Sequence, residues 1–379
     1  MPRHNKMNIP IRITLCSCAA LLVAFTATNC LFAQAPQPAN PHPSLEEKKG
    51  KEYTINVDVN LVVLHATVVD KRGHIVNDLK GEDFRVYEDG ALQKVSVFSH
   101  ADIPVTMGIV IDDSGSMREK RQAVNAAALA FVKTSNPQDQ VFVVNFNDVY
   151  YLDTPGEFAS NIEDLKSALD KIDSRGGTAL YDAVYASLDH VKLGNRDKKV
   201  ILTITDGEDN ASRYTFEELL RYAQKSSAVI YTIGLLGSEE PGGLFKIHGA
   251  SAHRAAKILE KLAEVSGGEA YLPKSLDEVE STCEQVAHDI RNQYTLAYYP
   301  SNTKKDGTFR AVRVDAFAPR SHTKLPVRTR PGYYAPLLPS QVVSDNVLKA
   351  TKDAESLALV AAPGSAVTPA GISQHALPF

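Results

Sequence analysis

Apolar residues follow two different patterns along the chain, and these patterns divide the sequence into three parts. In the middle part, continuous apolar runs alternate with segments whose apolar residues recur at helical spacing. A continuous run is typical of a strand buried on both faces, as in a parallel sheet covered by helices. The apolar runs are 105–111, 141–146, 199–205 and 228–236, and the helical segments are 118–132, 162–172, 179–191, 216–224, 254–265 and 276–290. The middle part therefore predicts an α/β fold with a doubly wound, mainly parallel sheet and helices on both faces.

Short runs that alternate apolar and polar residues flank this part on both sides. They lie at 53–69, 84–87 and 94–98 before it, and at 294–299, 308–317 and 324–329 after it. Turn signals such as Glu88-Asp89-Gly90 and Asp306-Gly307 separate them, which is typical of antiparallel strands. Because an isolated hairpin is only marginally stable in water, we expect the two sets to pair with each other. The α/β domain is then inserted in, or flanked by, a small antiparallel β-sandwich.

The first 35 residues have the features of an export signal. Arg3, Lys6 and Arg12 give a basic start, an apolar stretch follows at 15–26, and Ala33-Gln34-Ala35 is a small-x-small cleavage site. The apolar stretch is too short for a comfortable membrane span. We therefore expect an exported protein that is periplasmic, secreted or attached to the cell surface, with no transmembrane span in the mature chain.

These patterns predict six consecutive parts. A Pro-rich, charged linker follows the signal, and the last segment is rich in Pro, Ala and Ser without a sustained period, so we expect it to be disordered. The parts are the signal peptide 1–35, the linker 36–51, the N-terminal half of the sandwich 52–103, the α/β domain 104–292, the C-terminal strands that complete the sandwich 293–335, and the tail 336–379.

Composition narrows the class of protein further. Hydrophobic residues make up 44% of the chain and charged residues 23%, close to the averages for soluble globular proteins. The net charge is only -4 and no block of Lys and Arg stands out, which argues against a nucleic-acid partner. Three of the four cysteines lie in the predicted signal, so Cys283 alone remains and no internal disulfide is expected.

Candidate metal ligands follow the ends of the predicted strands. Asp112, Ser114 and Ser116 come directly after the first buried strand, at the edge of the sheet where doubly wound folds bind ligands. Thr178 follows two glycines at the start of a predicted helix, and Asp206 ends another buried strand. Carboxylate and hydroxyl oxygens suit Mg²⁺, Mn²⁺ or Ca²⁺ rather than zinc or copper. The sequence therefore predicts one divalent cation at this edge, with Mg²⁺ favoured.

These motifs also resemble a known family. The D-x-S-x-S sequence, the later Gly-Gly-Thr and the Thr-Asp-Gly after a strand are similar to the metal-ion-dependent adhesion site of von Willebrand factor type A domains, over about residues 104–292. The resemblance implies that the two serines and the threonine coordinate the metal directly, and that the aspartates do so directly or through water. It implies a binding module, not an enzyme, in which an Asp or Glu of a protein partner completes the metal site.

The flanking segments resemble a narrower group. Residues 78–84, 86–90 and 330–335 are similar to exported bacterial proteins described as VWFA-related, known mainly from acidobacteria. This resemblance supports the architecture and assigns no activity.

Other interpretations of the same residues stay open. A single Ser at a strand-to-helix junction is more often a helix cap than a ligand. Asp113, Glu208 and Asp209 are expected either to tune the bound cation or to be solvated loop acids. Ser114 could act as a hydrolase nucleophile, but the segment lacks the first glycine of G-x-S-x-G. The domain could also be a structural component of an envelope assembly whose metal only stabilises loops.

Overall fold

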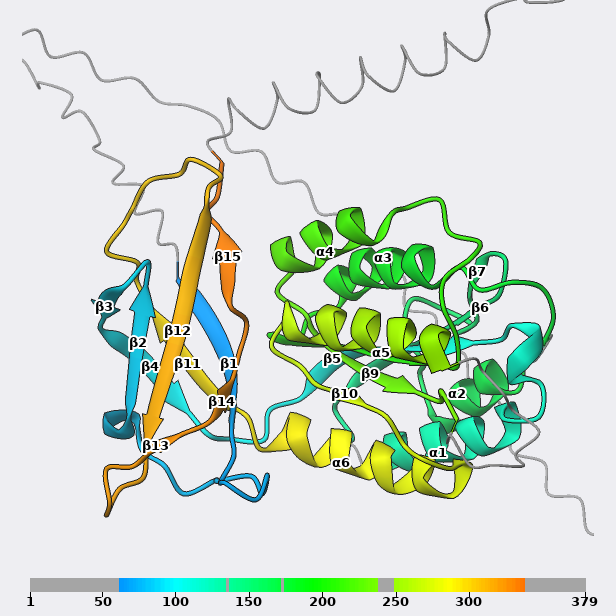
Figure 1. The fold of residues 1–379 in the computed structure, drawn as a ribbon, viewed down its shortest axis with the longest axis horizontal. Helices are drawn as coiled ribbons and strands as arrows, with labels where there is room; N and C mark the ends of the chain where they lie inside the picture. Colours follow the sequence, from blue (N-terminus) through cyan, green and yellow to red (C-terminus); the bar gives the residue numbers. More distant parts are fainter. Residues whose placement is uncertain (1–60, 134–135, 172–173, 238–248, 338–379) are drawn as a thin grey trace, which may run out of the picture. The chain divides into compact units, whose positions relative to one another are not determined.

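The computed structural model describes residues 61–133, 136–171, 174–237 and 249–337 (Figure 1). The predicted signal peptide, the linker and nearly all of the predicted tail lie outside the described residues, as does the first half of the predicted strand 53–69. Among the helices that the structure describes, none is both long enough and apolar enough to span a bilayer.

A six-stranded sheet forms the centre of the α/β part, in the order β10-β9-β8-β5-β6-β7. All neighbouring strands are parallel except β7, which is antiparallel to β6. The strands are β5 (Val105–Asp112), β6 (Gln140–Phe146), β7 (Tyr150–Leu152), β8 (Lys198–Thr205), β9 (Val229–Gly234) and β10 (Ala270–Tyr271). The chain leaves β5 toward β6 and later returns to β8 on its other side, so the strand order reverses beside β5. Doubly wound folds bind ligands at such a point.

Helices cover both faces of this sheet, as the apolar runs predicted (Figure 1). Along β8, Val200, Leu202 and Ile204 pack into one core, while Ile201 between them packs into the other. The helices on the first face are α1 (Arg121–Lys133), α2 (Ile162–Leu169) and α6 (Val279–Arg291), and those on the second are α3 (Leu180–His190), α4 (Phe216–Lys225) and α5 (Gly249–Glu264). The predicted doubly wound α/β fold is therefore confirmed.

Local capping sets some of the helix boundaries. At the start of α4, Thr215 Oγ1 accepts from the Glu218 backbone N–H, and the Glu218 carboxylate accepts from the Thr215 N–H at 2.9 Å. This reciprocal pair is a capping box. Two predicted helices begin later than expected. Residues 118–120 form a turn between η2 (Gly115–Met117) and α1, and the 3₁₀ turn η4 (Leu276–Glu278) takes the place of the first residues predicted for α6.

The flanking segments form two antiparallel sheets with a shared core. The first sheet has the strand order β14-β1-β11-β4. The second sheet has the order β13-β12-β2-β3, and a fifth strand, β15, pairs with β12. Leu64 and Leu296 from the first sheet and Val86 and Val314 from the second are buried in this core. The strands are β1 (Val62–Val68), β2 (Phe84–Glu88), β3 (Ala91–Gln93), β4 (Val95–Ser99), β11 (Tyr294–Tyr298), β12 (Phe309–Phe317), β13 (Lys324–Leu325), β14 (Val327–Arg328) and β15 (Gly332–Tyr334). Strands from before and after the α/β part pair with each other, as predicted.

The pairing inside the sandwich differs from the sequence prediction in two places. The turn at Asp89 and Gly90 is present, but β2 pairs across it with the short β3, and β4 pairs with β11 in the other sheet. The predicted strand 324–329 is split at Pro326 into β13 and β14, which belong to different sheets. Proline has no backbone N–H to donate to a ladder, so it marks the change of sheet.

A buried polar network joins α6 to the sandwich. Asp289 on α6 is 1% exposed; its carboxylate accepts from Thr67 Oγ1 at 2.7 Å and from Arg328 Nη2 at 2.9 Å. Gln293, directly after α6, donates to the Tyr231 hydroxyl at 3.1 Å. These bonds tie β1 and β14 to the last helix of the α/β part.

Candidate metal centre

Four of the five predicted ligands are connected at the carboxyl ends of β5 and β8. Asp112 is the last residue of β5, and Ser114 and Ser116 lie on the turn that follows. Ser116 Oγ donates to Asp206 Oδ1 at 2.8 Å, and the Ser114 and Ser116 hydroxyls are 3.1 Å apart. Oxygens from two strands therefore meet at one edge of the sheet.

Asp112 is completely buried at this edge. Its Oδ1 accepts from the Ser114 backbone N–H at 2.8 Å, and its Oδ2 accepts from Thr205 Oγ1 at 2.6 Å. Burial raises the pKa of Asp112 to about 6, and the nearby Asp206 carboxylate adds to the rise, although bonds from Thr205 and Ser114 oppose it. A cation at this position would compensate a buried negative charge.

Thr178 is positioned by a loop whose backbone conformation strongly favours glycine. Gly176 has φ +73°, and a Cβ there would clash with the carboxylate of Asp148. The same carboxylate accepts from the Gly177 N–H at 2.7 Å. The Gly115 N–H donates to the Gly176 carbonyl at 3.3 Å, which joins this loop to the serine turn.

Asn210 holds Thr178 from the other side. The Asn210 side chain accepts from the Thr178 N–H at 2.9 Å, and the Asn210 N–H donates to the Thr178 carbonyl at 3.0 Å. Hydrogen bonds to the backbone of Thr178 therefore fix its position. Within the described residues, its hydroxyl makes no hydrogen bond to the other four predicted ligands.

Lys120 is a member of this cluster that the sequence analysis did not identify. Its ammonium group contacts Asp206 Oδ2, while Ser116 occupies Oδ1 of the same carboxylate. Both charged groups are buried. Lys120 lies four residues after Ser116, so its signal in the sequence is a basic residue one helical turn beyond the last serine.

Asp113 contacts Ser174 and Arg121. Its carboxylate accepts from Ser174 Oγ at 2.8 Å and lies 3.4 Å from the guanidinium of Arg121. Burial lowers the pKa of Arg121, and Asp113 opposes this effect. The described contacts of Asp113 therefore hold the 174 loop against α1.

Glu208 and Asp209 also have partners of their own. Glu208 pairs with Arg254 on α5 at 2.8 Å, on the surface of the domain. Asp209 accepts from the Tyr181 N–H at 3.0 Å and from Ser212 Oγ at 2.5 Å, and burial raises its pKa. Within the described residues these contacts link Glu208 to α5 and Asp209 to the start of α3 and to Ser212, so both acids organise the surroundings of the site.

The donor atoms of the cluster fit a small hard cation. In the part of the chain that the structure describes, no group of three or more His, Cys, Asp or Glu side chains could hold a metal. The serines and Thr178 would provide hydroxyl oxygens as further donors beside the two carboxylates. Such neutral oxygen donors with two carboxylates match the preferences of Mg²⁺.

A family model supports the assignment of the α/β part. The model of the von Willebrand factor type A (VWA) domain matches residues 107–208. Residues 107–208 belong to a VWA domain. The matched segment includes all five predicted ligands of the metal centre. The match tests neither the adhesion site nor the narrower resemblance to exported VWFA-related proteins, and both stay predictions.

Several known proteins are similar to parts of the chain. An uncharacterized protein of Borreliella burgdorferi is 24% identical over 144 residues; the match covers 38% of this chain and 39% of that relative's length. A VWA protein from Catenulispora acidiphila has a TM-score of 0.42 at 15% identity, with 74% of each chain covered. Proximal thread matrix protein 1 from the mussel byssus has a TM-score of 0.39 at 21% identity, covering 52% of this chain and 49% of that one.

Proposed function

We propose that the VWA domain binds one divalent cation, and through it an acidic side chain of a protein partner. Mg²⁺ is the proposed cation, with Mn²⁺ and Ca²⁺ as the other hard ions that oxygen ligands accept. The residues proposed to hold the cation are Asp112, Ser114, Ser116, Thr178 and Asp206. The proposed role is adhesion or protein interaction outside the cytoplasm, without catalysis.

One observation carries this proposal. Ser116 on the turn after β5 donates to Asp206 after β8, while Asp112 lies buried beside them with its pKa raised by burial. The Ser114 and Ser116 hydroxyls and the Asp206 carboxylate therefore form a chain of hydrogen-bonded oxygens, which supports a shared ligand set. The proposed cation would replace the hydrogen bonds between them.

The charge of the proposed site favours an incoming carboxylate. A dication together with Asp112, Asp206 and Lys120 carries one net positive charge. The serines and the threonine are neutral donors, so they leave this charge uncompensated. An Asp or Glu of a partner would neutralise it, and the charge-assisted contact gains strength because the surroundings are partly desolvated.

A structural role for the metal is the second candidate. In that case the cation would hold the serine turn, the Gly176–Thr178 loop and the Asp206 loop together without contacting a partner.

A hydrolase that uses Ser114 is the weaker alternative, because the Ser114 hydroxyl is paired with Ser116 and nucleophilic serines need an adjacent base.

Metal binding and partner binding can be separated experimentally. We expect Mg²⁺ titration calorimetry to detect one site in the purified chain and about a hundredfold weaker binding in Asp112→Asn, which keeps the shape of the side chain. The exposed Asp78→Asn in the sandwich is the matched control and should bind Mg²⁺ like the wild type.

Affinity capture from the native envelope then tests the partner. Proteins captured with Mg²⁺ should be released by EDTA and should not bind Asp112→Asn. Metal-dependent thermal stabilisation without metal-dependent capture would favour the structural role. Labelling of Ser114 by a serine-reactive probe would favour the hydrolase.

A further inference from the structure

A pocket of about 750 Å³ lies beside strand β1 and shares no residue with the metal centre. Two lining residues, Asp197 and Ser227, come just before β8 and β9, so this pocket is at the amino ends of these strands. The metal centre lies at the carboxyl ends of β5 and β8. A ligand in the pocket would therefore be independent of the proposed cation.

One wall of the pocket is apolar although it faces outward. Leu61 is 40% exposed, Val63 is 42% exposed and Tyr299 is 53% exposed, and all three line the pocket. They alternate with residues such as Leu64 that fill the sandwich core. The outer face of a sandwich strand is normally polar, so exposed apolar side chains gathered at one pocket indicate a binding surface.

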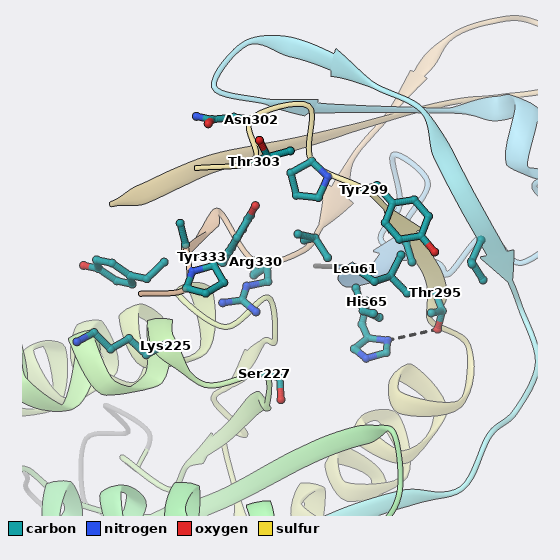
Figure 2. Close-up of a pocket in the computed structure, with 18 of the residues that line it drawn as sticks. Leu61, His65, Lys225, Ser227, Thr295, Tyr299, Asn302, Thr303, Arg330 and Tyr333 are labelled. Carbon is teal, nitrogen blue, oxygen red and sulfur yellow. Dashed lines mark hydrogen bonds between the residues drawn. The ribbon is translucent and has the colours of Figure 1, made fainter. Parts of the chain in front are cut away.

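The opposite wall is basic. Figure 2 shows Lys225 and Arg330 on one side of the pocket and Leu61, His65 and Tyr299 on the other. Arg330 is fixed by its bonds to the carbonyls of Gly332 at 2.8 Å and Gln224 at 2.7 Å. The guanidinium is therefore held in place before any ligand arrives.

The charge of the lining is opposite to that of the chain. The whole chain has a net charge of -4, yet the pocket has four Lys or Arg side chains against one carboxylate, that of Asp197. The basic residues are Lys225, Lys304, Lys305 and Arg330. Burial lowers the pKa of His65 to about 3, helped by Lys198 and Arg330, so its ring is an uncharged part of the wall at neutral pH.

We propose that this pocket binds a small organic anion with an apolar body, of the class of long-chain carboxylates. The apolar body packs on Val63 and Tyr299, and the carboxylate pairs with Arg330 and Lys225. The volume lies in the range of small-molecule sites, about 300–1,000 Å³. A stable protein partner would instead need about 800 Å² of surface on each side.

A single tryptophan can report on this pocket because the chain contains none. Tyr299→Trp places a fluorophore at the apolar wall. Titration with sodium dodecanoate, kept below its micelle concentration, should shift its emission to the blue and reach saturation. Tyr150→Trp on β7, an exposed tyrosine outside the pocket, is the control reporter and should not respond. Equal responses from both reporters would overturn the proposal.

Two substitutions then test the two walls separately. In the Tyr299→Trp background, Val63→Asp and Lys225→Glu should each weaken dodecanoate binding at least tenfold, and the exposed Lys94→Glu should not. Both test residues are exposed, so unchanged melting curves are expected. Unchanged dodecanoate affinity in both variants would contradict the proposal.

The choice of probe tests the ligand class. Dodecyltrimethylammonium, which has the same tail and the opposite charge, should bind at least tenfold more weakly than dodecanoate. Equal binding of the two would show that the basic residues are not used and would overturn the proposal. A hexaglutamate peptide that binds as tightly as dodecanoate would overturn it in favour of a peptide site. EDTA should leave dodecanoate binding unchanged, which separates this site from the metal centre.

Discussion

The ammonium group of Lys120 lies against the carboxylate of Asp206, so a residue proposed to hold a dication already contacts a cation of the protein itself. Ser116 takes the other oxygen of this carboxylate. Because both Lys120 and Asp206 are buried, each stabilises the charge of the other. A dication that binds here has to share Asp206 with Lys120 or displace it.

Replacing this lysine should therefore strengthen metal binding. Lys120→Met removes a positive charge beside the proposed cation, and we expect the affinity for Mg²⁺ to rise at least tenfold, or about 1.4 kcal/mol. The metal-free protein should become less stable, because Asp206 loses its buried partner. Titration calorimetry and urea unfolding in EDTA measure the two effects. The exposed Lys133→Met on α1 is the control, and weaker Mg²⁺ binding by Lys120→Met would contradict this account.

The Gly176 loop provides a second test. Gly176→Ala forces alanine to a φ of +73° and toward the Asp148 carboxylate. The backbone alone should cost about 1–2 kcal/mol, and displacement of Thr178 should weaken Mg²⁺ binding about tenfold. Gly207→Ala is the matched control, because a Cβ at Gly207 meets nothing within 4 Å. Equal Mg²⁺ affinities of the two variants would show that this loop does not position a ligand.

Lys198 should make stability depend on pH. Burial lowers its pKa to about 7 from the ordinary 10.5, with Arg291 adding to the effect and Asp289 opposing it. Between pH 7 and pH 10.5, Lys198 is protonated in the unfolded chain and largely deprotonated in the folded one. The free energy of unfolding should therefore rise from pH 7 to pH 9, by at most about 1.4 kcal/mol per pH unit from this group.

Urea unfolding at pH 7, 8 and 9 measures this slope. Lys198→Met should flatten it, because the group whose pKa differs between the folded and unfolded states is gone. Lys133→Met should keep the slope of the wild type. The same slope in Lys198→Met would show that other groups cause the dependence.

The buried network at Asp289 should contribute strongly to stability. Asp289→Asn removes the buried carboxylate that accepts from Arg328 and leaves this guanidinium with the more exposed Glu269; removing one member of a buried pair costs about 3–5 kcal/mol. Urea unfolding of Asp289→Asn and of the exposed control Asp78→Asn measures the difference. A loss below about 1 kcal/mol would mean that Glu269, which Arg328 already contacts, compensates for the missing carboxylate.

The sequence predicts the central sheet well because its strands are covered on both faces. The continuous apolar runs that became β5 and β8 are typical of strands buried on both faces. Short strands such as β10 and β15 were missed, since two or three residues carry no periodicity and their pairing depends on distant partners. The change of sheet at Pro326 is likewise decided by tertiary contacts.

The candidate site was predictable only in part. Acidic and hydroxyl residues at strand ends are visible in the sequence because the carboxyl edge of a sheet gathers them. Lys120 was missed because a lysine at the start of a helix is usually solvated. Thr205 was missed because its hydrogen bond to Asp112 depends on the register between β5 and β8.

The most direct test of the metal centre is a crystal structure of the chain grown with Mn²⁺, with anomalous diffraction measured at the manganese edge. We expect one anomalous peak, with the hydroxyl oxygens of Ser114, Ser116 and Thr178 within about 2.3 Å of it. A fully occupied Mn²⁺ elsewhere, or a structure at saturating Mn²⁺ in which Thr178 and the two serines are too far apart to share one ion, would contradict it.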